Sequence, residues 1–447
     1  MEDGLNLHMD FSRFHRIVRE TLLTRLEGRV VQVVGLIAEA EGIGQGIGSF
    51  CRILLDDGSD MLAEVVGFRQ DHTLLMPYGS TRGIRPGSRV MVEAARPLAP
   101  VGEAYLGRVI DGMGEPLDGL GPIAAEVAYP LYGKPINPLD RDPVKEPMDV
   151  GVCAINTMIP LGRGQRVAIM AGSGVGKSVL MGMMTRHTAA DVVVIGLIGE
   201  RGREVKDFVE DILGEEGRKK SVVIAATSDV PPLVRMRGAY LATTMAEYFR
   251  DQGKEVLLLL DSLTRYAMSS RDVGLAAGEP PTTRGYTPSF FVQVPILLER
   301  AGTVKGKGSI TGIYTVLVEG DDMNDPVGDT VRSIVDGHIV LSRQIASRGH
   351  YPAIDVLGSV SRVARDVTRP ENLALREQAI RLLASYREAE DMIQIGAYVD
   401  GSNPQIDMAK KMAPKIQAFL RQRVDVRVTS EEGFSTLAGI LVGDRDP

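Results

Sequence analysis

The sequence of 447 residues contains no tryptophan and only two cysteines, Cys51 and Cys153. Two cysteines exclude a disulfide framework and a cysteine-based zinc knuckle, and they are typical of a reducing compartment. Basic residues do not predominate: 51 lysines and arginines against 58 aspartates and glutamates give a net charge of −7. A nucleic-acid-binding protein coated in basic residues is therefore not expected. The longest apolar runs, at residues 192–195 and 256–260, are far shorter than a membrane span.

The remaining composition is that of an ordinary globular protein, with 44% hydrophobic and 24% charged residues. A chain of this length is long enough for two or three domains. The first ten residues are acidic and lack an apolar core, so we expect no secretory signal there. Residues 11–26 (FSRFHRIVRETLLTRL) have apolar side chains at helical spacing with arginines between them. This helix either lies on its own domain or docks on a partner or an anionic surface, and the pattern does not separate the two.

From Gly28 to about Ala95 the pattern changes to short β-type runs separated by glycine and aspartate clusters. Several short strands with closely spaced turns predict a small barrel or sandwich. Glycines at 42, 44, 46 and 48 imitate a nucleotide-binding loop, but the following SFCRILL is typical of a strand. Without a helix N-terminus to receive a phosphate, this segment is predicted to be a glycine-rich hairpin.

A proline- and glycine-rich connection occupies residues 96–147, and beyond it β-type runs alternate with helical segments. The runs RVAIM, VVVIGLI, SVVIAAT and VLLLLD are apolar at nearly every position. Such runs predict a parallel sheet that is covered by helices on both faces. After about Pro370 the strands stop and amphipathic helices follow. The expected layout is therefore a barrel, an α/β core and a helical tail.

The strongest motif is MAGSGVGKS at residues 170–178, between the run RVAIM and a predicted helix that begins at Ser178. A phosphate-binding loop needs small residues so that backbone N–H groups can converge on phosphate oxygens. It also needs a lysine that reaches the β- and γ-phosphates, here Lys177, and a hydroxyl that binds Mg²⁺, here Ser178. Ala171 stands where the general pattern has its first glycine. The predicted nucleotide-binding residues of this loop are Gly172, Ser173, Gly174, Val175, Gly176, Lys177, Ser178 and Val179.

Two acidic residues at the ends of separate apolar runs complete this prediction. Asp261 ends the run VLLLLD, where its carboxylate would hold the hydration shell of Mg²⁺. Glu200 follows VVVIGLI in the segment GERGRE, and there it would orient and polarise the attacking water as a general base. The alternative for this segment is a solvated helix start, which is our interpretation of Arg203 and Glu204.

Taken together, these motifs resemble the catalytic subunits of hexameric rotary-type ATPases. The ATPase of the flagellar and type III protein-export apparatus is the closest match. The resemblance extends over nearly the whole chain, through the segments AGSGVGKSVL, LIGERGREVKDF, ATSDVPP, MAEYFRDQGKEVLLLLDSLTRYA, GLAAGEPPTTRGYTPSFF, GSITGIYTVLVEGDDMNDPVGD, SIVDGHIVLSR and HYPAIDVLGSVSRV.

The resemblance implies an α/β fold with an N-terminal small β-barrel, a RecA-like P-loop nucleotide domain with a parallel sheet, and a C-terminal helical domain. The expected boundaries are residues 1–27 for a partner-docking helix, 28–96 for the barrel, 97–370 for the ATPase domain and 371–447 for the helical domain.

The resemblance also implies roles for four residues outside the loop. Arg201 would approach the γ-phosphate. Arg362, in SVSRV, resembles the arginine finger that enters a neighbouring subunit's site and is worth about 10³–10⁵ in rate; without the resemblance we would interpret it as a surface arginine. The adenine would lie against Tyr351 and Phe419. Related rotary subunits carry a further aromatic where this chain has QRV at residues 422–424, which implies weak base selectivity.

The function implied is Mg²⁺-dependent ATP hydrolysis by a homohexameric ring that energises or primes protein export through the flagellar type III secretion apparatus. The expected location is the cytoplasm, at the periphery of the inner-membrane export apparatus. A peripheral stalk-like regulator would bind residues 1–26, and a coiled-coil central stalk would enter the pore near residues 278–288. Further expected partners are an export-gate membrane protein and chaperone–cargo complexes, and no nucleic acid is expected.

Four alternatives remain at this point. A virulence-type secretion ATPase shares the same motifs. A proton-driven ATP synthase catalytic subunit has an acidic C-terminal run where this chain has IGAYVDGSNPQIDMA, and its phosphate loop typically ends in threonine. A non-catalytic nucleotide-binding subunit would lack Glu200. An RNA-dependent ring helicase would display basic and aromatic residues on its barrel, which here offers Phe50, Phe68 and scattered arginines only.

Overall fold

The computed structural model describes residues 27–94, 97–318 and 325–442. The chain divides into two compact units with a boundary between Pro97 and Leu98. The helix predicted over residues 11–26 lies outside the described residues. No helix among the described residues combines the length and the apolar character that crossing a membrane requires.

The first unit contains a closed six-stranded antiparallel barrel. Around the barrel the strand order is β1-β2-β5-β4-β3-β6. Alternate residues point inward, and the interior is filled by small and branched side chains such as Val30, Ala38, Ala63 and Val90. The strands are β1 (Glu27–Val34), β2 (Ile37–Glu41), β3 (Phe50–Leu54), β4 (Asp60–Arg69), β5 (His72–Pro77) and β6 (Arg89–Ala94).

The glycine-rich segment between β2 and β3 is not the hairpin that the sequence predicts. β2 pairs with β1 and β5, whereas β3 pairs with β4 and β6, so the segment joins strands that are not neighbours. Gly42, Gly44 and Gly48 have positive φ values, which only glycine adopts without strain. They let the chain turn as it passes between strands. The segment is followed by the strand β3 and not by a helix, as the sequence predicts.

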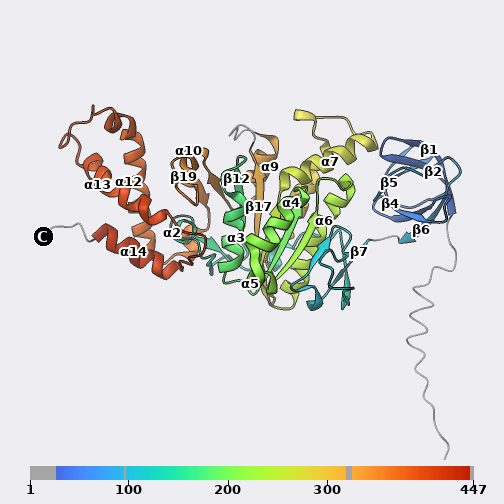
Figure 1. Cartoon of the computed structure of the whole chain (residues 1–447), viewed down its shortest axis with the longest axis horizontal. Helices are drawn as coiled ribbons and strands as arrows, with labels where there is room; N and C mark the ends of the chain where they lie inside the picture. Colours follow the sequence, from blue (N-terminus) through green and yellow to red (C-terminus); the bar gives the residue numbers. More distant parts are fainter. Residues whose placement is uncertain (1–26, 95–96, 319–324, 443–447) are drawn as a thin grey trace, which may run out of the picture. The chain divides into compact units, whose positions relative to one another are not determined.

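The second unit is built on a nine-stranded sheet, which confirms the predicted α/β fold class (Figure 1). Its strands are parallel except β19, which is antiparallel to β18, and the short β16, which is antiparallel to β17. In spatial order they are β19 (Ile354–Ser361), β18 (Gly337–Leu341), β12 (Arg166–Ala171), β17 (Ser309–Leu317), β15 (Glu255–Asp261), β13 (Val192–Ile198), β14 (Ser221–Ala226) and β8 (Val109–Asp111), with β16 (Gly302–Thr303) on β17.

Helices cover both faces of this sheet, and alternate residues of the same strand enter opposite cores. In β12, Ala168 and Met170 join one core while Val167 and Ile169 join the other. The first core is completed by α6 (Pro232–Asp251), α7 (Leu263–Ala277), α8 (Pro288–Leu298) and α9 (Pro326–Ile334). The second is completed by α2 (Cys153–Met158), α3 (Lys177–His187) and the C-terminal α12 (Pro370–Gln394), α13 (Pro404–Leu420) and α14 (Ser430–Val442).

The other elements are short connections around this core. They are β7 (Leu98–Val101) with β9 (Val127–Pro130), β10 (Pro147–Met148) with β11 (Leu161–Gly162), α4 (Gly202–Asp207), α5 (Gly214–Lys219), α10 (Arg343–Ser347) and α11 (Ala364–Val367). A π-helical turn, Phe208–Leu213, joins α4 to α5. Three 3-10 turns occupy Glu103–Tyr105, Pro138–Asp140 and Thr283–Gly285.

Candidate active site

Three charged side chains meet at the carboxyl edge of the sheet, in the arrangement that the sequence predicts. Because β12, β13 and β15 run parallel, the residues that follow them lie at one edge. Lys177 begins α3, which follows β12, Glu200 comes two residues after β13, and Asp261 ends β15. The Lys177 Nζ lies 3.3 Å from Glu200 Oε1 and also contacts Asp261 Oδ1. The residues come from separate strands, and only the fold brings them together.

The loop between β12 and α3 has the backbone form that phosphate binding requires. Gly174 and Gly176 have φ values of +78° and +89°, in the left-handed region that favours glycine. Val175 between them is 2% exposed and fixes the loop to the core below. The helix begins at Lys177, one residue earlier than predicted. The N–H groups of its first turn have no hydrogen-bond acceptor within the helix. Such a helix start attracts anions through these N–H groups and the helix dipole.

The protonation of this cluster is set by burial and by the charges within it. Burial alone would lower the pKa of Lys177, but the carboxylates of Asp261 and Glu200 raise it above its ordinary value, so the lysine is charged. Burial raises the pKa of Glu200 to about 7, with a contribution from the charge of Asp261, although Lys177 opposes the shift. Glu200 is therefore poised near neutrality, where a group that accepts a proton from water is most useful.

Two residues that the sequence analysis did not assign to this cluster also contact it. Thr315, buried on β17, donates a hydrogen bond to Asp261 Oδ1 at 2.6 Å and so fixes the orientation of that carboxylate. Glu204, which the sequence assigns to a solvated helix start, shares a hydrogen bond with Glu200 that contributes to the raised pKa of Glu200. β17 also contains the hydroxyl-bearing residues Ser309, Thr311 and Tyr314, so no signal in the sequence singles out Thr315.

Arg201 lies next to Glu200 in sequence but does not join the cluster. Its side chain is 79% exposed, and its Nη1 lies 3.5 Å from Glu204 Oε1. The backbone explains this placement: Arg201 is extended and precedes the first turn of α4, so its side chain leaves the sheet edge. A role for Arg201 at the γ-phosphate stays a prediction.

The two predicted adenine contacts lie in neighbouring segments. A Cβ atom placed on Gly176 would lie 3.6 Å from the ring of Tyr351, so this ring, which is 49% exposed, stands beside the phosphate loop. Gln422 N donates to Tyr351 O at 3.0 Å, which ties the end of α13 to the same place. Phe419, in the last turn of α13, is half-buried and packs against the core on the α3 face. Tyr351 is thus the better placed of the two for a base.

Arg362 lies at the opposite edge of the sheet from Lys177. Because β19 is antiparallel to β18, its last residue, Ser361, pairs with Gly337 at the amino edge. The exposed Arg362 comes next, level with Asp336 and with the start of β12. From Arg166, at this edge, to Gly172, where the phosphate loop begins, the chain advances six residues, or about 20 Å at 3.3 Å per residue. Within one chain, Arg362 therefore does not reach the cluster around Lys177.

The described residues contain no group of three or more histidine, cysteine, aspartate or glutamate side chains that could hold a metal ion. The candidate oxygen donors at the sheet edge are the carboxylates of Glu200 and Asp261 and the hydroxyl of Ser178, which lies at the start of α3. This donor set fits Mg²⁺ that arrives with the phosphates of a nucleotide, since this ion is commonly held by one or two carboxylates, waters and phosphate oxygens.

The chain matches three known domains, one after another along the sequence. Residues 30–91 match the ATP synthase alpha/beta family, beta-barrel domain. Residues 151–361 match the nucleotide-binding domain of the same family. Residues 368–439 match the T3SS EscN ATPase C-terminal domain. The order agrees with the barrel, sheet and C-terminal helices described above.

Similar proteins and structures cover nearly the whole chain. The flagellum-specific ATP synthase of Pseudomonas aeruginosa is 50% identical over 94% of this chain and 94% of its own length. The type 3 secretion system ATPase of Xanthomonas euvesicatoria is 47% identical over 93% and 94%, respectively. The assembled ATPase EscN of enteropathogenic E. coli superposes with a TM-score of 0.88 at 43% identity, over 93% of this chain and all of that one. EscN in complex with its central stalk EscO gives a TM-score of 0.86 at 42% identity, over 93% and all of the two chains.

Proposed function

This chain belongs to the ATP synthase alpha/beta family, in the branch of flagellum-specific and type III secretion ATPases, and we infer from this membership that it is an ATPase that energises protein export. The observation that carries the inference is the meeting of Lys177, Glu200 and Asp261 beside a glycine loop at a helix start. A phosphate-binding loop, a metal-facing carboxylate and a carboxylate poised near neutrality are the parts that ATP hydrolysis requires.

The contacts support a division of roles among these residues. Lys177 is within reach of both carboxylates and stands at the helix start where the phosphates would lie. When phosphate oxygens accept hydrogen bonds from Lys177, Asp261 is released from the lysine, and Asp261 and Ser178 are the residues that would hold Mg²⁺. Glu200 then orients the attacking water and accepts its proton. A properly placed general base contributes about 10²–10⁴ in rate.

We assign the remaining part of the site to a second copy of the chain. Arg362 lies at the far edge of the sheet, so only another protomer can bring it to the γ-phosphate as an arginine finger. This supports a homohexameric ring with a site at each seam, in keeping with the assembled state of EscN. Arg201, Tyr351 and Phe419 have supporting roles, at the γ-phosphate for Arg201 and at the adenine for the two aromatic residues.

The cellular role proposed is flagellar export, with the ATPase in the cytoplasm at the periphery of the inner-membrane export apparatus. The flagellum-specific relative at 50% identity favours this over the virulence-type relative at 47%. A coiled-coil central stalk in the pore, by analogy with EscO, a peripheral stalk-like regulator at residues 1–26, an export-gate membrane protein and chaperone–cargo complexes are the proposed partners. A virulence-type export system is the alternative.

The decisive experiment compares the purified chain with Glu200→Gln. We expect the native protein to hydrolyse ATP with Mg²⁺, and Glu200→Gln to bind a fluorescent ATP analogue normally while turnover falls about 10²-fold or more. Glu215→Gln, on the exposed α5, is the matched control and should retain full activity. Unchanged hydrolysis by Glu200→Gln would remove Glu200 from the mechanism, and a native ring without ATP turnover would contradict the proposed activity.

A test in cells separates the two export systems. In a bacterium that lacks its flagellar export ATPase, the native chain should restore swimming, and Glu200→Gln should not. Restoration of virulence-type secretion, without recovery of swimming, would favour the alternative.

A further inference from the structure

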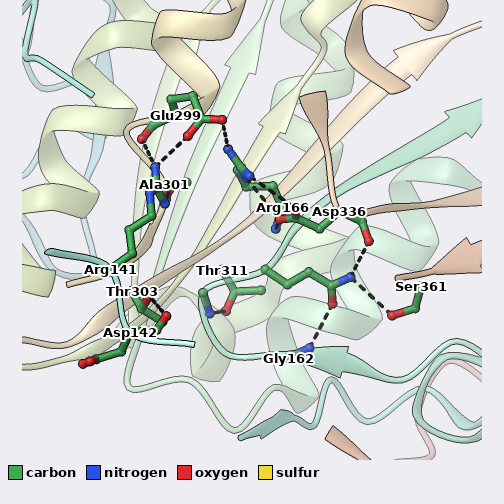
Figure 2. Close-up of polar contacts among 12 residues, drawn as sticks. Arg141, Asp142, Gly162, Arg166, Glu299, Ala301, Thr303, Thr311, Asp336 and Ser361 are labelled. Atoms are coloured by element: carbon green, nitrogen blue, oxygen red, sulfur yellow. Dashed lines mark hydrogen bonds and ion pairs between the residues drawn. The ribbon is translucent and has the colours of Figure 1, made fainter. Parts of the chain in front are cut away.

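A charged network at the amino edge of the sheet, drawn in Figure 2, includes Asp336, whose backbone carbonyl accepts a hydrogen bond from the N–H of Arg362. It consists of Arg141, Arg166, Glu299 and Asp336, which we call the amino-edge network. The four residues come from the connection before β10, the start of β12, the end of α8 and the residue before β18. None of them belongs to the cluster around Lys177, and the activity proposed above gives them no role.

Asp336 is the centre of this network. Its carboxylate accepts hydrogen bonds from Arg166 Nε and Nη2, each at 3.1 Å, and from the backbone N–H of Arg166 at 3.1 Å. Its own N–H donates to Arg166 O at 2.8 Å. Two parallel hydrogen bonds between a guanidinium and a carboxylate fix both orientation and distance. Asp336 is therefore held to the start of β12 by both its backbone and its side chain.

Asp336 in turn holds the residue after β19. The backbone N–H of Arg362 donates to Asp336 O at 2.9 Å. Gln165 Nε2 donates to the same carbonyl at 3.1 Å and to Ser361 Oγ at 3.3 Å, and that hydroxyl donates to Pro160 O at 2.7 Å. The side chain of Arg362, by contrast, is exposed, and its Nη2 donates to Arg332 O at 3.5 Å, the limit of a hydrogen bond. The direction in which Arg362 projects is thus set by its backbone anchor.

The rest of the network holds Arg166 in place. The side chain of Arg166 is 13% exposed and contacts Glu299 Oε1 through Nη1. Glu299 is also bound by Arg141, whose Nη2 lies 2.7 Å from Glu299 Oε2 and whose Nη1 donates to Ala301 O at 2.9 Å. β12 itself is paired on both sides, with β17 and β18. These contacts fix the position of the Arg166 side chain, which in turn fixes Asp336. Such fixed contacts matter where a reactive group must be placed within about 1 Å.

We propose that Asp336 and Arg166 are positioning residues that aim Arg362 at the nucleotide site of the neighbouring protomer. The inference rests on the proposed function, since it requires Arg362 to act on a second chain. It goes beyond that function because it assigns the network to the protomer that donates the arginine. Loss of the network should harm the neighbour's site and leave the protomer's own loop, at the other edge of β12, intact.

The test uses rings of two differently tagged subunits, purified through both tags. The first subunit carries Arg362→Ala, so it has an intact loop but no arginine to donate. The second carries Lys177→Ala, so it donates its arginine but has no working loop of its own. All hydrolysis in such a ring occurs where the first subunit's loop meets the second subunit's Arg362. Asp336→Asn, which keeps the side-chain size and removes the charge, is then added to one subunit at a time.

We expect Asp336→Asn in the arginine-donating subunit to lower the rate about 10–100-fold. The same change in the loop-carrying subunit should alter it by less than about twofold, with unchanged binding of a fluorescent ATP analogue. If Asp336→Asn lowers the melting temperature, Arg166→Gln serves as a second variant, and it should show the same difference between the two subunits. Lys219→Ala, which removes an exposed ion pair with Glu215 on α5, is the control and should have no effect in either subunit.

Equal losses in both subunits would show a general structural effect and would overturn the proposal, as would no loss in the donating subunit. If mixed rings of the two parent subunits hydrolyse no ATP although the native ring does, Arg362 does not act across the seam and the inference falls with it. That result is distinct from failure of the proposed activity itself, in which the native ring would also be inactive.

Discussion

Glu200 is the residue whose ionisation controls the proposed chemistry. As a proton acceptor it must be ionised before the water attacks, yet burial raises its pKa to about 7 and only Lys177 opposes the shift. The same burial strengthens its interaction with the reacting water once solvent is excluded. A group of this kind makes activity depend on pH within the physiological range.

The first prediction at this scale concerns that pH dependence. Because the protonated form is inactive, kcat/KM for Mg·ATP should rise about tenfold per pH unit at low pH and level off above about pH 7. Glu204→Ala removes a hydrogen bond that favours the protonated form, so it should move the midpoint to lower pH. A kcat/KM that is flat between pH 5 and 8, in protein shown to be folded, would contradict the role of Glu200.

The second prediction concerns Tyr351, whose ring stands beside Gly176. If adenine stacks on this ring, Tyr351→Ala should raise KM for ATP about 5–150-fold, corresponding to about 1–3 kcal/mol of stacking, with little change in kcat. Tyr351→Phe keeps the ring and should behave as the native protein in steady-state kinetics. A selective loss of kcat in Tyr351→Ala would show that the ring serves the chemical step instead.

The principal residues of the site could be predicted from the sequence because each follows an apolar run. Lys177, Glu200 and Asp261 are assigned separately, and the parallel sheet then brings them to one edge. Thr315 could not be assigned in this way, since its partner Asp261 lies on the neighbouring strand and the contact exists only in the fold. The exposure of Arg201 was also beyond prediction because it depends on where α4 begins.

At the scale of elements, the close approach of α6 to the sheet is a structural requirement of the nucleotide domain. A Cβ atom on Gly196, in β13, would lie 2.5 Å from Leu260 Cδ2 and 3.2 Å from Ala242 Cβ. Both neighbours are buried, on β15 and α6. Because interiors are packed to high density, the missing side chain at this position lets α6 lie directly on β13.

We therefore predict that Gly196→Val destabilises the larger unit by about 1–3 kcal/mol through overpacking. The measurement is the urea midpoint followed by far-ultraviolet circular dichroism. Gly202→Ala is the matched control, since a Cβ atom there has open space at the start of α4, and it should leave the midpoint unchanged or raise it slightly. A Gly196→Val protein as stable as the native one would contradict the close packing.

For each element that was not predicted from the sequence, there is a physical reason why the sequence did not reveal it. β8 lies in the proline- and glycine-rich connection, and three residues are too few to show a strand pattern, although they pair with β14 at the edge of the main sheet. α14 follows the helices that were predicted and completes the core on the α3 face through Phe434 and Leu437. The segment between β2 and β3 was wrongly predicted as a hairpin because glycine spacing reveals a turn but not which strands pair.

At the scale of the whole molecule, the two edges of one sheet have different tasks. The carboxyl edge holds Lys177, Glu200 and Asp261 beside the glycine loop, and the amino edge presents Arg362, whose backbone N–H is bound to Asp336. The length of β12, about 20 Å, separates the two edges. With the roles proposed above, a single chain carries parts of two different sites, and a closed ring is the arrangement that would complete every site at once.

The rate of ATP hydrolysis per subunit, measured across protein concentrations that carry the chain from monomer to ring, tests this claim most directly. Sedimentation on the same samples gives the fraction assembled. We predict that the rate follows this fraction, with subunits in the ring about 10³-fold or more faster than monomers because only they receive Arg362 from a neighbour. A monomer that hydrolyses ATP as fast as the ring would contradict the account.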